Sequence, residues 1–139
     1  MQYRLVPCAE GDEDLIREQI DAIADSIVPP EEGAKDETLV FRIDDGEGNI
    51  AAGCILEIDS WRIADLDILW VDEPRRNQGL GACLLGEVER EARENGAYLL
   101  LAGGTDWQVP FFRKHSYAVN GAIEDCPMGH SEYLLAKRL

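Results

Sequence analysis

Apolar positions recur along the chain with two periodicities, one helical and one alternating, which predict helices and strands. Alternation with polar neighbours predicts strands in residues 2–6, 39–43, 50–58 and 63–71, and the turn at 45–49 makes a hairpin of the second and third strands. A first helix is predicted after the acidic residues 12–14, and the prolines at 29 and 30 end it. Its apolar face holds Leu15, Ile16, Ile20, Ile23 and Ile27.

The second half of the chain predicts a helix-crossed parallel step. A helix starts near Leu80 and ends at Asn95-Gly96, where glycine accepts the left-handed cap conformation. Residues 98–102 are almost wholly apolar, which predicts a strand that is buried on both faces and parallel to a neighbour. A short helix at 109–115 and strands at 117–123 and 132–137 follow. The order βαβββαβαββ predicts one mixed α/β domain over residues 1–139, with about seven strands and helices on both faces of a twisted sheet.

Charge and composition narrow the class of partner. The net charge is −15, and all of it arises in residues 1–74, because residues 75–139 hold equal numbers of acids and bases. Such a surface disfavours nucleic acid and anionic lipid. No apolar run is long enough for a membrane helix, and the N-terminus does not resemble a signal peptide, so a cytoplasmic protein is expected. The cysteines and histidines show no metal-ligand spacing, so no metal is expected.

One turn predicts an anion site. Residues 75–81 read Arg-Arg-Asn-Gln-Gly-Leu-Gly between a predicted strand and a predicted helix. Glycines allow a ligand close to the backbone, and free N–H groups at a helix start attract an anion. Arg75 and Arg76 add positive charge in a protein with few bases. The spacing differs from the dinucleotide fingerprint and from the Walker loop. A phosphate site and a plain tight turn both fit this segment taken alone.

These motifs resemble the GNAT superfamily of acyl-CoA-dependent N-acyltransferases. Residues 76–81 match the family's pyrophosphate pattern [Q/R]-x-x-G-x-[G/A], and residues 68–74 have the form of the strand before it. Residues 111–117 are similar to the family's late FYxKxGF element, and residues 125–133 to its closing segment. The resemblance covers nearly the whole chain.

The resemblance implies an enzyme that transfers an acetyl group from acetyl-CoA to a primary amine in a ternary complex. The central strand would leave its neighbour and pair with the pantetheine arm, the turn would hold the pyrophosphate, and the late helix would flank the arm. The coenzyme contacts implied in this way are Leu69, Trp70, Val71, Arg75, Arg76, Asn77, Gln78, Gly79, Leu80, Gly81, Ala82, Phe111, Phe112 and Lys114.

Candidate proton acceptors lie on the strand at 63–71. Alternation places Asp65 and Asp67 on one face with Leu69 and Val71, and Glu57 on the preceding strand is a candidate neighbour. Close carboxylates raise one another's pKa, which suits a general base. They could equally bind the ammonium group of the substrate and leave deprotonation to water. The opposite, apolar face is expected to hold Ala64, Leu66, Ile68 and Trp70.

The residue that protonates the departing thiolate is left open. Phe112 stands where the family usually has a tyrosine, so Tyr117, Tyr133, His130 and water remain as candidates. We take Tyr117 as the catalytic candidate among them and His130 as a substrate contact. The acidic loop after the first helix predicts further contacts to a cationic small-molecule amine, at Glu31, Glu32 and Asp36.

Two other functions compete with this interpretation. A non-catalytic acyl-CoA-binding module would explain Phe112, and a protein or peptide N-acetylase would use the same coenzyme site. Since small members of the family are often dimers, the resemblance also implies a homodimer.

Overall fold

The computed structural model describes residues 2–139, which divide into two compact units at residues 1–32 and 33–139. The first unit holds the helix α1 (Asp12–Ile27), as the apolar spacing predicts. The Asp12 carboxylate accepts a hydrogen bond from the Ala9 N–H (2.8 Å) at its start. The strand predicted at residues 2–6 is wrong: this segment has no regular secondary structure, and none of the six strands of the sheet pairs with it.

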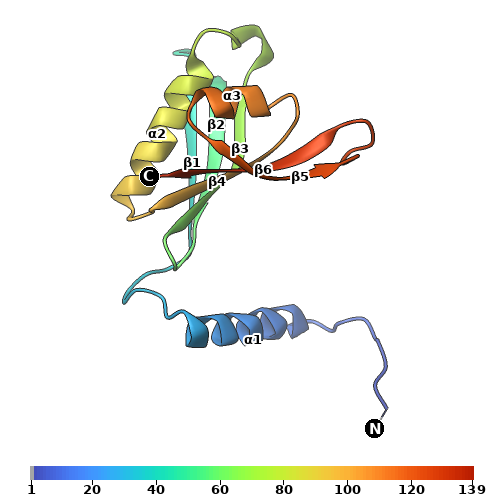
Figure 1. Cartoon of the computed structure of the whole chain (residues 1–139). Coiled ribbons are helices and arrows are strands. Elements are labelled where there is room, and N and C mark those ends of the chain that lie inside the picture. Colours follow the sequence, from blue (N-terminus) through green and yellow to red (C-terminus); the bar gives the residue numbers. More distant parts are fainter. Residues whose placement is uncertain (1) are drawn as a thin grey trace. The chain divides into compact units, whose positions relative to one another are not determined.

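The second unit is a six-stranded mixed sheet with two helices (Figure 1). Its elements are β1 (Glu37–Asp44), β2 (Ile50–Ile58), β3 (Ile63–Val71), α2 (Leu80–Glu94), β4 (Leu99–Thr105), α3 (Val109–Lys114), β5 (Ala118–Glu124) and β6 (Ser131–Arg138). The strand order is β1-β2-β3-β4-β6-β5. All neighbours are antiparallel except β3 and β4, which form the predicted parallel step across α2. The mixed α/β class is confirmed, with six strands in place of about seven.

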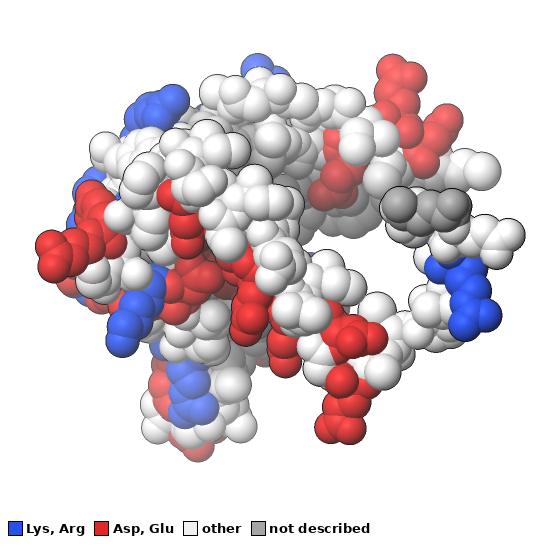
Figure 2. Space-filling model, turned by 90° about the horizontal axis from the view of Figure 1, so that it is seen from below, with Lys and Arg blue, Asp and Glu red and all other residues white. Residues whose placement is uncertain are grey.

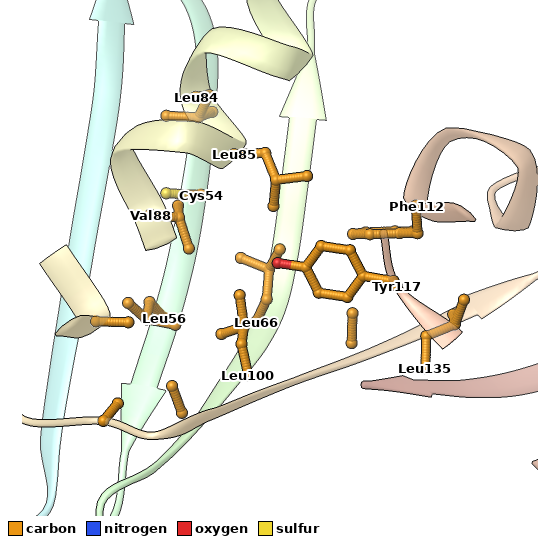
Figure 3. Packing of buried hydrophobic residues seen from close by; sticks show 14 of the residues in the cluster. Cys54, Leu56, Leu66, Leu84, Leu85, Val88, Leu100, Phe112, Tyr117 and Leu135 are labelled. Atoms are coloured by element: carbon orange, nitrogen blue, oxygen red, sulfur yellow. The ribbon is translucent and has the colours of Figure 1, made fainter. Parts of the chain in front are cut away.

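One apolar core lies between the sheet and the two helices. Figure 3 shows side chains of β2, β3, β4 and β6 meeting those of α2 and α3. The side chains at its centre are fully buried: Val88 on α2, and Leu56, Leu100 and Leu135 on the strands. Because α2 and α3 contribute to the same cluster, both cover the same face of the sheet within residues 33–139, where the sequence predicted helices on both faces.

A β-bulge changes the face of half of β3. Ile68 pairs with Ile55 and Leu66 pairs with Leu56, so Asp67 between them has no partner on β2. The extra residue reverses the alternation beyond it. Leu69 and Val71 pack against the core, while Ile68 and Trp70 are 48% and 42% exposed. The prediction that Ile68 and Trp70 share a face with Ala64 and Leu66 is therefore wrong.

A buried polar cluster fastens α2 to the segment after α3 and to β6. The Glu89 carboxylate accepts hydrogen bonds from the Tyr117 hydroxyl (3.0 Å) and from the Lys137 ammonium (2.8 Å). Lys137 also donates to the carbonyl of His115 (3.1 Å). Burial, followed by the nearby Glu89 charge, raises the pKa of the Tyr117 hydroxyl. In Figure 3 this hydroxyl points between the core side chains toward α2.

Replacing Glu89 by alanine tests this cluster. The substitution leaves the Lys137 charge without its partner in a mostly buried place, so we expect the free energy of unfolding to fall by about 3 kcal/mol. Glu87→Ala on the exposed side of α2 removes only a surface ion pair with Arg90 and is expected to cost no more than about 0.5 kcal/mol. Urea denaturation of both variants measures the difference. Equal losses would show that the Glu89 contacts add nothing to stability.

Candidate functional site

A groove of about 800 Å³ lies where β3, the start of α2 and α3 come together. These three parts meet at one end of the sheet, at the top of the unit in Figure 1. The groove is lined by 13 of the 14 predicted coenzyme contacts; Gln78 is the exception, and its side-chain amide is turned to the Pro74 carbonyl (3.5 Å). Segments predicted separately from the sequence thus line one groove.

The groove reaches the point at which β3 and β4 separate. The two strands pair only from Ile63–Leu99 to Leu66–Ala102. Beyond this point β3 stays with β2 as far as Val71, and β4 stays with β6 as far as Thr105. The β4-facing backbone groups of residues 67–71 therefore lack the ladder that residues 63–66 have. Backbone groups of this kind need hydrogen-bond partners, which an extended ligand with amide groups can supply.

The start of α2 is built to receive an anion. Gly79 precedes the helix with φ +83°, a conformation that glycine adopts without strain. The first helical bond runs from the Cys83 N–H to the Gly79 carbonyl, so the N–H groups of residues 80–82 have no partner within the helix. No acidic residue lies in the first turn. The helix dipole and these N–H groups together favour a phosphate.

The two arginines before α2 differ in their contacts. The Arg75 guanidinium donates to the Asp45 carboxylate in the β1–β2 turn (2.9 Å) and lies 3.6 Å from Asp72. Arg76 donates through Nε to the Val71 carbonyl (3.1 Å), which leaves its terminal nitrogens for another acceptor. Arg75 therefore stabilises the turn, and the terminal nitrogens of Arg76 can donate hydrogen bonds to an anion.

Helix α3 forms the opposite wall of the groove. A Cβ at Gly81 would lie 3.3 Å from the Phe111 ring, so a larger residue at this position would require the ring to shift. Phe112 is 5% exposed and its ring packs on Tyr117 in the core. Lys114 lines the groove as predicted. Phe112 thus packs in the core and also contributes a small part of the groove lining.

The carboxylates predicted as catalytic are divided between the groove and the adjoining sheet face. Asp67, the bulged residue, lines the groove. Asp65 pairs directly with Glu57 across β2 and β3, and neither lines the groove. Partial burial raises the pKa of Asp65, and the charges of Glu57 and Asp67 raise it further. The sheet therefore carries like charges on directly opposed positions, an arrangement that destabilises a strand pair.

Tyr117, His130 and Asp36 do not line the groove. Tyr117 is in the core with Glu89, and His130 sits on the β5–β6 turn with its Nδ1 3.1 Å from the Asp106 carboxylate. Asp36 accepts a hydrogen bond from the Ser60 N–H (2.9 Å) at the end of β3 remote from the groove. Glu31 and Glu32 belong to the first unit, which is described separately.

Gln108, His115 and Gly103 are among the lining residues that sequence reasoning did not assign to the site. Gln108 and His115 flank α3, and Gly103 lies on β4 just past the last β3–β4 pair. Gln108 is fixed by the Thr105 N–H and hydroxyl (3.0 and 3.1 Å). His115 immediately follows the Lys114 that the family motif identified, so adjacency to that motif was an available signal. Gly103 had none, because the position at which two strands separate is a tertiary property.

Residues 2–139 hold neither a metal-binding cluster nor a membrane-spanning helix. No cluster of three or more His, Cys, Asp or Glu residues is suited to a metal ion in this part of the chain. None of its helices has the length and apolar content that a membrane span requires.

Comparison with known proteins identifies the family of this chain. Residues 6–117 match the model of the acetyltransferase (GNAT) family. The chain is 34% identical over 94 residues to a blasticidin-S acetyltransferase of Streptomyces morookaense, covering 66% of this chain and 68% of that protein. An acetyltransferase structure from Bacillus cereus ATCC 14579 aligns with a TM-score of 0.89 at 31% identity, over 99% of this chain and 98% of the other.

A second solved structure shows the same fold at lower identity. It is a putative streptothricin acetyltransferase from Bacillus anthracis in complex with acetyl coenzyme A, with a TM-score of 0.65 and 12% identity over 73% of this chain and 63% of the other. The family match, the relatives and the groove agree. The chain belongs to the GNAT family and is an acetyl-CoA-dependent N-acetyltransferase.

Proposed function

We propose that this protein acetylates the primary amine of a small cationic molecule by direct attack on bound acetyl-CoA. The observation that carries the proposal is the separation of β3 from β4 at Leu66–Ala102, next to the groove residue Asp67. It gives the thioester a place between the strands, within reach of a carboxylate. The coenzyme enters from the α2 side, and the amine meets it from the sheet face that α2 and α3 leave uncovered.

The coenzyme is held along the groove by backbone groups. Its pyrophosphate accepts hydrogen bonds from the N–H groups of residues 80–82 and from the terminal nitrogens of Arg76. Its pantetheine amides pair with the open edge of β3 at Leu69–Val71, where the β4 ladder has ended. The N–H near Val71 is a donor for the oxyanion that develops on the thioester carbonyl.

Asp67 is the proposed base. An amine reaches the site as an ammonium ion and must lose one proton before its nitrogen can attack. That proton passes to the Asp67 carboxylate, the new C–N bond forms, and the C–S bond breaks as the tetrahedral intermediate collapses. The second nitrogen proton leaves with the thiolate sulfur, directly or through water, and gives free CoA thiol and the amide. Both substrates must be bound together, so positioning contributes much of the rate.

The charge distribution supports a cationic acceptor. Figure 2, which views the chain from below, shows more Asp and Glu than Lys and Arg side chains on that side. Nearer the groove, Glu57 and Asp65 pair across β2 and β3, and the charge of Asp67 acts on Asp65. Such a field raises the local concentration of a cation. The name of the Streptomyces relative, an acetyltransferase of blasticidin-S, supports a small molecule as the acceptor.

Release of free thiol from acetyl-CoA, measured across a panel of amines, tests the proposal. We expect turnover with small cationic amines and a rate that falls with rising ionic strength, because salt screens the acidic face. Neutral amines and lysine-containing peptides serve as comparison substrates. Turnover confined to the peptides would assign the protein to peptide acetylation, and binding of coenzyme without turnover of any amine would refute the proposal.

Comparing Arg76→Ala with Arg75→Ala separates the proposed phosphate contact of Arg76 from the structural ion pair of Arg75. Loss of a charge-assisted hydrogen bond is expected to raise KM for acetyl-CoA on the order of 10- to 100-fold. KM for S-acetylpantetheine, which lacks the phosphates, should stay unchanged. Arg75→Ala is the comparison: Arg75 is already paired with Asp45, so we expect a smaller effect on KM and a loss of stability. An equal rise for both coenzyme forms in Arg76→Ala would contradict the phosphate assignment.

Asp67→Asn and Tyr117→Phe distinguish the two predicted catalytic groups. Removing a general base is expected to lower kcat on the order of 100-fold or more. Tyr117 lies in the core, so its phenylalanine variant should keep kcat and lose about 1 kcal/mol of stability from the missing hydrogen bond to Glu89. Steady-state kinetics and urea denaturation provide the two readouts. The opposite result, with kcat lost in Tyr117→Phe alone, would make Tyr117 the catalytic group.

Asp65→Asn tests whether the opposed carboxylates are kept at the expense of stability. The raised pKa of Asp65 means that its ionised form disfavours the folded state, so stability falls as pH rises from Asp65's ordinary range through the raised pKa. Asparagine does not titrate. We therefore expect the variant to be more stable than the wild type at pH 7 and to lose this advantage in acid. A variant less stable at pH 7 would indicate a favourable contact of the Asp65 carboxylate.

A further inference from the structure

Glu132 on β6 lies beside the groove, although neither the family motifs nor the groove lining singles it out. Its Oε1 is 3.6 Å from the point where a side chain at Gly103 would begin. Gly103 lines the groove and is the first residue of β4 after the last β3–β4 pair. The missing side chain at Gly103 therefore leaves the Glu132 carboxylate next to the opening between the strands.

The Glu132 carboxylate has no hydrogen-bond donor or cation paired with it among residues 2–139, although the residue is half-buried. Other enclosed carboxylates of this unit are matched: Glu89 has two donors, and the 2% exposed side chain of Asp45 has Arg75. Partly desolvated carboxylates without a partner are unfavourable. A carboxylate without a partner beside a substrate groove therefore indicates a group that pairs with a bound ligand.

Glu132 and Asp67 flank the opening from opposite sides. Asp67 follows the last paired residue of β3, and Glu132 lies one strand beyond β4, opposite Thr105. In a continuous sheet two strand spacings of about 4.8 Å would separate these strands by roughly 10 Å, and the separation of β3 from β4 makes the distance here larger. Two cations bound at hydrogen-bond distance from these carboxylates would therefore be at least ~5 Å apart. That spacing is of the size found in a diamine whose nitrogens are separated by a short carbon chain.

We propose that Glu132 is a specificity-determining residue that binds a second cationic group of the acceptor. This inference rests on the proposed function, in which Asp67 takes the proton from the reacting amine. Glu132 makes the same contact in the ground state and in the transition state, because the second cation does not react. It therefore acts on KM for the acceptor and leaves kcat in place. The preferred substrates are small molecules that carry a primary amine and a second ammonium or guanidinium group.

Glu132→Gln, assayed with 1,4-diaminobutane and with 1-aminobutane, tests the proposal. We expect the wild type to prefer the diamine in kcat/KM, and the variant to lose at least about tenfold of that preference through KM for the diamine. Its kcat and its KM for acetyl-CoA should stay within about twofold of wild type. Glu124→Gln removes the same charge from β5, which lies one strand farther from the opening, and should keep the preference. Thermal melts of both variants verify folding.

The possible results separate this inference from the proposed function. Amine turnover by the wild type without preference for the diamine, or a preference unchanged in Glu132→Gln, would overturn the inference and leave the proposed function intact. An equal fall of kcat for both amines would also overturn it, because Glu132 would then belong to the proton path. Absence of thiol release with every amine in the panel would instead refute the proposed function.

Discussion

The candidate site depends on one constraint in the sheet: the parallel pairing of β3 with β4 ends after Leu66–Ala102. Each strand then keeps its other neighbour, so the sheet opens without losing its remaining ladders. The opening leaves the edge of β3 unpaired beside Asp67, where we propose that the thioester binds. The start of α2 and the wall of α3 lie at the same end, because α2 crosses from β3 to β4 and α3 follows β4.

The bulge at Asp67 links this opening to the core. One unpaired residue in β3 turns Leu69 and Val71 inward, where they pack against the cluster formed with α2. The same shift turns Ile68 and Trp70 outward and places Asp67 on the groove. Simple alternation fails here because it assumes an unbroken period of two, and a bulge is a property of the pair of strands.

Carboxylates serve three physical roles in this unit. Glu89 and Asp45 are enclosed and fully matched, and they fasten α2, β6 and the phosphate turn. Asp65 and Glu57 oppose one another on the strand pair, where their repulsion disfavours the fold. Glu132 is half-buried and has no partner among residues 2–139. Acidic residues that stabilise the fold thus differ in their contacts from those that we propose bind a cation, and the overall net charge does not reveal this difference.

The sequence by itself determined the three α-helices, all six strands of the sheet, the parallel step and the glycine turn before α2, although it also predicted a strand at residues 2–6 that the structure lacks. Local signals sufficed because apolar periodicity, the Asn95-Gly96 stop and the glycines at 79 and 81 act over a few residues. Only the tertiary structure decided that Arg75 is held by Asp45, that Tyr117 is buried against Glu89, and that Gly103 and Glu132 border the opening. These contacts join residues far apart in the chain, and no local pattern encodes the partner of a side chain.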